Sequence, residues 1–226
     1  SPKFFQFLLF IFRDVFSFTS SPDYGIRAAA ITSLTALASY NDQPEIIGLL
    51  EATGDKAEVA ELQRAILAAA MDHKDPSARS ALILEAMDRS RDRLKLIPLL
   101  SATGGGEALK RVAAEFENGD AITRDVCFDA LTHWNDISSA KILREIIASG
   151  NKTFGMPAFD AYMRMVSAAR LKPERKLLMI KDMAPYAADP GARAGMVALA
   201  GSLEIRQTEF FITPYLSDPS EEVRSA

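Results

Sequence analysis

The chain has 226 residues, a formal net charge of -4, 48% hydrophobic residues and 25% charged residues. This length suffices for one large domain or a short array of helical repeats, and the composition excludes wholesale disorder and collagen-like structure. The mildly acidic charge lacks the basic footprint expected of a nucleic-acid binder. One cysteine and two histidines are too few for an internal disulfide or a conventional zinc site, so we expect no metal and no cofactor.

Residues 1–21 form a phenylalanine-rich segment that differs from the rest of the chain. The apolar stretch from Phe4 to Phe12 is too short for a membrane span, which needs about 20 residues. Three interpretations stay open: a helix packed against the first repeat, the remnant of an export signal or interfacial anchor, or a reading-frame artefact. Seven of the 13 phenylalanines lie in this segment: Phe4, Phe5, Phe7, Phe10, Phe12, Phe16 and Phe18.

Residues 22–226 show helical periodicity almost throughout, with apolar residues three and four positions apart. The segments alternate as first and second helices of six pairs, with a period of about 34 residues that is typical of helical-repeat arrays. We predict first helices at residues 24–40, 57–72, 91–102, 120–134, 154–171 and 190–203. We predict their partners at residues 43–53, 76–89, 105–118, 138–149, 173–187 and 206–217.

Aspartate-proline pairs mark several predicted helix starts: Asp75-Pro76, Asp189-Pro190 and Asp218-Pro219. The aspartate oxygen can accept a hydrogen bond from a free backbone amide, and proline at the first helical position loses no hydrogen bond. Glycine-containing turns at residues 104–106, 118–120 and 150–151 separate other helices. These connections are short, so consecutive helices should pack antiparallel.

One short pattern recurs, in which an acidic cap is followed by an arginine and then by small residues. It occupies residues 23–29, 189–195 and 218–226, with a weaker copy at residues 120–126. This pattern resembles the start of the first helix in a HEAT repeat. The sequence is therefore similar to a HEAT array over residues 22–226, and the fold expected is an all-α superhelix, a HEAT-like solenoid of about six helix pairs.

More narrowly, the chain resembles the alanine-rich HEAT regions of multidomain envelope proteins of Bacteroidetes and Planctomycetes. In that family such arrays often lie beside a 3-keto-disaccharide hydrolase-like domain or a sugar-dehydrogenase-like propeller, and the array itself is not the known catalytic part. The resemblance implies a periplasmic location in the cell envelope, with a cytoplasmic location as the alternative, and second helices that line a concave surface. It is carried by residues 96–109, 129–136, 172–178, 197–203 and 214–216.

The last residues, 218–226, resemble the opening of a further helix, so we expect the array to be cut at its C-terminal end. An array cut there should expose apolar surface near Phe210, Phe211 and Tyr215. Charges on the predicted second helices alternate in sign, which is typical of a solvated face. The cations among them are the candidate partner-binding residues: Lys110, Arg111, Lys141, Arg144, Arg175 and Lys176.

Few residues suggest catalysis. His133 and Trp134 could supply a base and a sugar-stacking ring, or a helix-terminal residue and a core anchor, and we favour the second interpretation. His73 lies in a polar turn that an N-cap explains, and Cys127 is expected to be a buried, inert thiol. Residues 104–106 lack phosphate-binding spacing and indicate a turn. A methionine-rich set favours core over a partner groove: Met156, Met163, Met165, Met179 and Met183.

Three functions remain open. The leading hypothesis is a non-catalytic scaffold that docks a protein or a neighbouring domain of the same chain. The alternative is a carbohydrate-binding surface that assists an associated sugar-processing domain, for which the candidate aromatics are Trp134, Tyr162, Tyr186 and Tyr215. A HEAT-like nucleic-acid enzyme is the third, and the acidic balance argues against it.

Overall fold

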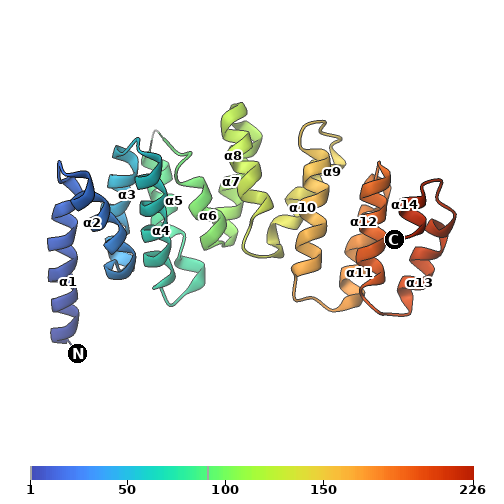
Figure 1. The fold of residues 1–226 in the computed structure, drawn as a ribbon, viewed down its shortest axis with the longest axis horizontal. Helices are drawn as coiled ribbons and strands as arrows, with labels where there is room; N and C mark the ends of the chain where they lie inside the picture. The colour runs from blue at the N-terminus through green and yellow to red at the C-terminus, as the bar shows by residue number, and fades with distance from the viewer. Residues whose placement is uncertain (1, 91) are drawn as a thin grey trace. The chain divides into compact units, whose positions relative to one another are not determined.

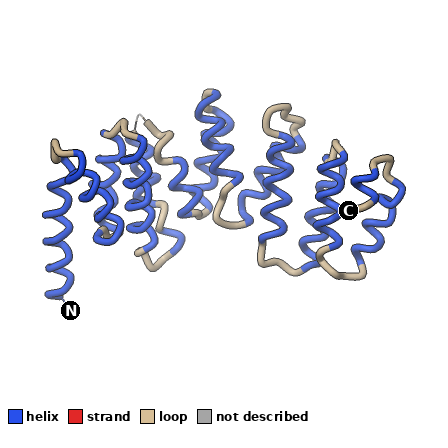
Figure 2. The backbone as a smooth tube through the Cα atoms, viewed as in Figure 1, coloured by secondary structure: helices blue, strands red, loops and turns tan. Residues whose placement is uncertain are grey.

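The computed structural model describes residues 2–90 and 92–226, with side chains from residue 10 onward. Within these residues the chain forms fourteen α-helices and six short 3-10 helices, and no strand (Figures 1 and 2). The predicted all-α class is therefore confirmed. The chain divides into two compact units, Ser1–Ala130 and Leu131–Ala226, which are described separately below.

All six predicted helix pairs are present in the described residues. The first helices are α2 (Tyr24–Leu37), α4 (Lys56–Met71), α6 (Ile97–Thr103), α8 (Ala121–Thr132), α10 (Gly155–Ala168) and α12 (Pro190–Gly201). Their partners are α3 (Gln43–Ala52), α5 (Ala81–Arg89), α7 (Gly106–Asn118), α9 (Ala140–Ala148), α11 (Pro173–Met183) and α13 (Gln207–Ile212). A four-residue helix, α14 (Glu221–Arg224), follows the last pair.

The phenylalanine-rich start is a helix, α1 (Pro2–Ser17), followed by the 3-10 helix η1 (Phe18–Ser20). It packs against α2, as the first of the three interpretations expects. Phe12 is almost fully buried and its ring contacts that of Phe16, with centroids 5.6 Å apart. Phe4, Phe5 and Phe7 lie outside the described side chains. Among the described residues, no helix combines the length and apolarity that a membrane crossing requires.

Proline explains three of the four largest differences from the predicted helix boundaries; the fourth is the start of α5, at Ala81 instead of residue 76. The third first helix begins at Ile97 instead of residue 91, with Pro98 in its first turn. A helix continuing N-terminal to this point would place Pro98 in its interior, where proline removes a hydrogen bond and clashes with the preceding turn. Pro185 and Pro214 likewise follow α11 and α13, where the chain tightens into the 3-10 helices η5 (Ala184–Tyr186) and η6 (Thr213–Ser217).

Each unit has its own layer of packed helices. In the first unit α4 packs against α2, α3 and α6, and its apolar side chains Leu62 and Ile66 are fully buried. In the second unit α10 packs against α9, α11 and α12, and its Phe159 side chain is almost fully buried. Helix α12 also packs against α13 and α14. Helices that are neighbours in sequence thus cover one another, as in a repeat array.

Aspartates cap several helices, as the sequence predicted. Asp23 and Asp189 accept hydrogen bonds from the backbone amides of Ile26 and Ala192, at 3.0 and 2.8 Å. Asp75 caps the 3-10 helix η3 (Pro76–Ala78) rather than an α-helix. Asp218 is different again, because it accepts from the amide of Ser220, one residue before α14 begins.

The arginines of the recurring pattern have a structural role. In the first unit, Arg27 and Arg124 each follow a capping aspartate by four residues and donate to a carbonyl upstream, at Ser21 and Glu117. Arg79, which lies outside the predicted copies of the pattern, follows Asp75 in the same way and donates to the carbonyl of His73. Arg193 does the same to Ala188 in the second unit. The pattern therefore encodes a helix start in which the aspartate holds the first amides and the arginine holds the preceding loop.

Candidate functional site

The first unit contains two of the predicted binding cations, both on α7. Lys110 is exposed and pairs with Glu107 one turn earlier, at 2.8 Å. Arg111 bridges to Asp88 of α5 at 2.7 Å and to Glu115 at 3.2 Å. The hydrogen bonds that Arg111 donates, first the one to Asp88, raise its pKa. Arg111 therefore joins two consecutive second helices.

The second unit contains the other four predicted cations. Lys141 is exposed on α9, and the Nε of Arg144 lies 2.6 Å from Asp182 of α11. Lys176 donates to the carbonyl of Ser167, at 2.6 Å, and so ties α11 to α10. Arg175 is exposed, and its guanidinium has no hydrogen bond or ion pair within the described residues. The Arg144–Asp182 ion pair thus links α9 to α11, and exposed charges of both signs remain on the two helices.

Two second helices of this unit each carry an exposed apolar side chain, and the sequence did not indicate that the two belong together. Leu178 of α11 is 67% exposed and Phe210 of α13 is 75% exposed. Lys181 of α11 lies 5.9 Å from the centroid of the Phe211 ring, so the two helices also meet through a cation–π contact. The exposure expected at Phe210 is confirmed.

The exposure expected near Phe211 and Tyr215 is found only in part: Leu216 beside them is 60% exposed, but these two rings are more covered than predicted. Both are half-buried, and their rings contact each other with centroids 5.5 Å apart. Tyr215 packs against a cluster that includes Val197 of α12 and Val223 of α14. The short α14 supplies the buried Val223 to this cluster. The exposed apolar surface near Phe211 and Tyr215 is smaller than expected for this reason.

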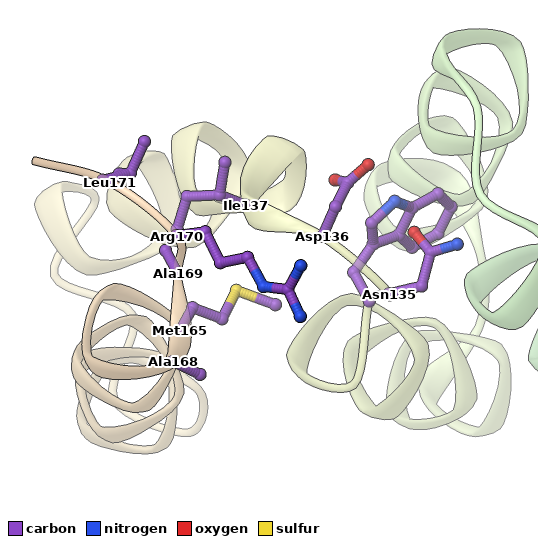
Figure 3. Close-up of a pocket in the computed structure, with 9 residues that line it drawn as sticks. Asn135, Asp136, Ile137, Met165, Ala168, Ala169, Arg170 and Leu171 are labelled. Carbon is purple, nitrogen blue, oxygen red and sulfur yellow. The ribbon is translucent and has the colours of Figure 1, made fainter.

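A hollow of about 410 Å³ lies in the second unit, between the segments that follow α8 and α10 (Figure 3). Trp134, Asp136 and Ile137 line it from the first segment. Met165 of α10, together with Arg170 and Leu171 beyond its end, lines it from the second. Figure 3 shows the Arg170 side chain extending from the α10 side toward Asn135 and Asp136. Nothing in the sequence indicates that Arg170 lies near Trp134, because the two residues are 36 positions apart.

Trp134 is only 5% exposed, which confirms the core-anchor interpretation. Its indole nitrogen is buried and has no hydrogen-bond partner within the described part of the chain. Tyr162 is 3% exposed. These two rings were candidates for stacking on a sugar, and that expectation is wrong because neither presents a face to solvent. Tyr186 and Tyr215 are half-buried.

The remaining candidates for chemistry have structural surroundings. Cys127 is fully buried, and burial raises the pKa of its thiol to about 12. The His73 ring contacts that of Tyr40, with centroids 4.4 Å apart, and its Nδ1 accepts from the amide of Asp75 at 3.1 Å. Gly104 and Gly105 adopt positive φ angles of 72° and 97° and form the turn between α6 and α7. Of the five methionines on or near helices α10 and α11 that were predicted to favour the core, Met163 and Met183 are buried.

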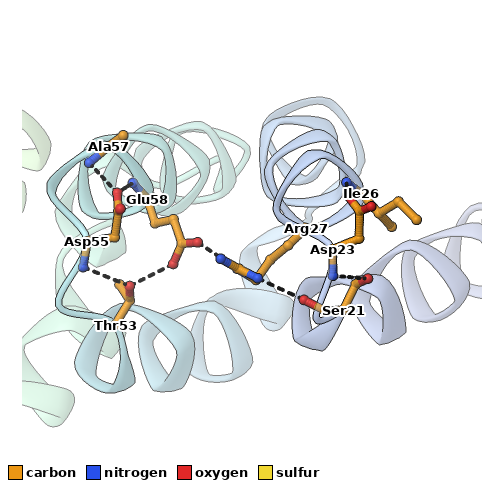
Figure 4. A network of polar contacts seen from close by, with 8 residues as sticks. All are labelled: Ser21, Asp23, Ile26, Arg27, Thr53, Asp55, Ala57 and Glu58. Carbon is orange, nitrogen blue, oxygen red and sulfur yellow. Dashed lines mark hydrogen bonds and ion pairs between the residues drawn. The ribbon is translucent and has the colours of Figure 1, made fainter.

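Four residues of the polar network in Figure 4 line a second hollow, in the first unit: Arg27, Thr53, Asp55 and Glu58. Glu58 accepts from the Nε of Arg27 and from the hydroxyl of Thr53, each at 2.7 Å. These two bonds, first that from Arg27, lower the pKa of Glu58 and mark the pair as a tie between α2 and α4. Within the described residues no group of three or more His, Cys, Asp or Glu side chains is arranged to hold a metal ion.

Comparisons with protein-family models, with curated proteins and with solved structures gave no match. The fold itself defines the class: an all-α protein built of repeated helix pairs in which neighbouring helices pack together.

Proposed function

We propose that this chain is a non-catalytic, HEAT-type scaffold that docks a protein partner or a neighbouring domain of its own chain. The observation that carries the proposal is a face made by the second helices of the second unit. We call it the second-helix surface. It consists of the exposed residues Lys141, Arg144, Arg175, Leu178, Lys181 and Phe210.

The second-helix surface has the composition of a protein interface. Leu178 and Phe210 supply exposed apolar side chains, and exposed charged residues lie on the same helices. Interfaces typically bury a few aromatic or aliphatic side chains at the centre and keep charged residues at the rim. The Arg144–Asp182 ion pair and the Lys181–Phe211 contact hold consecutive second helices together, so a partner would meet a preorganised face.

The resemblance to HEAT regions of envelope proteins suggests where the scaffold acts and what it docks. It supports a location in the cell envelope and a neighbouring sugar-processing domain as the docked partner. In HEAT arrays second helices line the concave side, which is where a docked domain would lie.

The test is a pull-down from envelope extract of the source cell, followed by identification of the recovered protein. We expect a specific protein whose recovery falls at least about tenfold with Leu178→Asp or Phe210→Asp, since a central anchor commonly contributes 2 kcal/mol or more. Ile122→Asp is the matched control, because Ile122 is equally exposed but lies on α8 in the first unit. Equal recovery by all three variants, or catalytic turnover by the chain alone, would contradict the proposal.

The carbohydrate-binding alternative is weaker than the sequence suggested. Of its four aromatics, only Tyr186 and Tyr215 retain partial exposure. A sugar titration that shifts the melting temperature of the protein, and fails to do so with Tyr186→Ala, would revive it.

A further inference from the structure

The hollow beside Trp134 contains two hydrogen-bond donors without a partner in the described residues, and its lining also includes the carboxylate of Asp136. Asp136 accepts from the amide of Ser138 at 2.7 Å, and the Met165 sulfur accepts from the hydroxyl of Ser139 at 3.3 Å. The indole N–H of Trp134 has no acceptor in the described residues, and Arg170 makes no hydrogen bond or ion pair there. A ligand that pairs both of these donors must supply acceptor atoms.

The unpaired indole N–H is a feature that requires explanation. A buried donor without a partner costs about 1–3 kcal/mol, and native proteins keep few of them. The nitrogen belongs to a side chain that lines a hollow, so a ligand in that hollow is the direct means of supplying the acceptor. The nitrogen itself is covered in this structure, so an acceptor reaches it only after side chains around the hollow shift. Arg170 is exposed and unpaired in the described residues, so its guanidinium is available to a ligand.

The rest of the lining is mainly apolar. Ile137, Met165 and Leu171 contribute side chains, and Ala168 and Ala169 leave room between them. The volume, about 410 Å³, lies in the range of small-molecule sites. A guanidinium at the rim favours a carboxylate, which it can bind through two hydrogen bonds.

We propose that this hollow binds a carboxylate carried on a compact apolar body. Arg170 holds the carboxylate, the Trp134 N–H donates to one of its oxygens, and the apolar body lies against Ile137, Met165 and Leu171. The carboxylate can belong to a free organic acid or to the C-terminus of a peptide. This site is separate from the second-helix surface and does not depend on the proposed scaffold function.

The chain has one tryptophan, so its fluorescence reports on this hollow directly. The probes are phenylacetate and N-acetyl-leucyl-leucine with a free carboxylate, each compared with its uncharged amide. We expect at least one acid to change the tryptophan fluorescence in a saturable way and to bind about tenfold more tightly than its amide. Binding of phenylacetate indicates a free acid as the source, and binding of the dipeptide alone indicates a chain end.

Arg170→Gln should abolish the preference for the acid over the amide, and because the side chain is exposed the variant should fold normally. Arg164→Gln is the matched control, since Arg164 is exposed on α10 outside the hollow and should leave binding unchanged. Trp134→Phe, measured by calorimetry, should weaken the acid several-fold if the variant folds.

Two results would overturn the proposal: no saturable response to either acid, or equal affinity of acid and amide in the wild type. Unchanged binding by Arg170→Gln would also overturn it. Failure of the pull-down above would leave this result untouched, because the probes here are small molecules and the readout is local.

Discussion

Arg193 and Asp218 are joined by two hydrogen bonds, from Nε to Oδ2 at 2.8 Å and from Nη2 to Oδ1 at 3.2 Å. The same guanidinium donates to the carbonyl of Ala188 at 3.2 Å. One side chain on α12 therefore connects the loop before its own helix to the loop before α14. The bond to Asp218 raises the pKa of Arg193 and lowers that of Asp218.

The first prediction concerns the two hydrogen bonds between Arg193 and Asp218. Arg193→Lys keeps the charge but cannot form two hydrogen bonds to one carboxylate while also reaching the Ala188 carbonyl. We expect a lower melting temperature and faster hydrogen exchange of the amides in α12 and α14. Arg206→Lys is the control, because the Arg206 side chain is exposed and unpaired within the described residues. Equal exchange in the two variants would show that these hydrogen bonds contribute nothing to the stability of α12 and α14.

The second prediction is a loss of stability in acid. Arg27 and Thr53 favour the charged form of Glu58 in the folded state, so its folded pKa lies below its unfolded value of about 4.3. The resulting stabilisation is complete above that unfolded value and is lost as the pH falls through the folded pKa. Asp75, Asp120 and Asp218 have pKa values lowered in the same direction.

Urea midpoints measured between pH 7 and pH 3 test this. Glu58→Gln should lower the midpoint at pH 7 and reduce the further loss on acidification, because its side chain does not titrate. A Glu58→Gln variant whose pH dependence matches that of the wild type would contradict the argument.

The third prediction concerns Cys127. With a pKa of about 12, its thiol at pH 8 carries about a thousandfold less thiolate than a free cysteine, and its burial blocks reagents. We expect a disulfide-exchange reagent to react with the native protein only at the rate of unfolding and to react at once in guanidinium chloride. Rapid reaction of the native protein would show that the thiol is accessible.

The fourth prediction compares two glycines. A Cβ at Gly119 would lie 2.6 Å from the carbonyl oxygen of Glu115 and from a methyl group of Thr123, so Gly119→Ala requires backbone movement and should cost about 1–3 kcal/mol of unfolding free energy. A Cβ at Gly48, inside α3, meets nothing within 4 Å. Gly48→Ala should therefore gain about 0.5–1 kcal/mol. Denaturant unfolding of both variants measures the two values.

The sequence was sufficient for the helices because its information on them is local. A capping aspartate such as Asp189 bonds an amide three residues away, and a proline such as Pro98 acts on its own turn. All six helix pairs were predicted for this reason. The errors at the ends of α11 and α13 came from treating the residues around Pro185 and Pro214 as continuous α-helix.

The sequence alone thus determined the all-α class, the pairing of the helices and their capping residues, since each depends on contacts within a few positions. Only the tertiary structure decided which polar groups meet. It placed Arg170 beside Trp134, Arg144 against Asp182 and Arg27 against Glu58, each pair separated by more than 30 positions in sequence. It also decided which aromatic rings are buried. Helical periodicity indicates that a ring lies on an apolar face, but how much of that ring remains accessible depends on the next helix that packs over it.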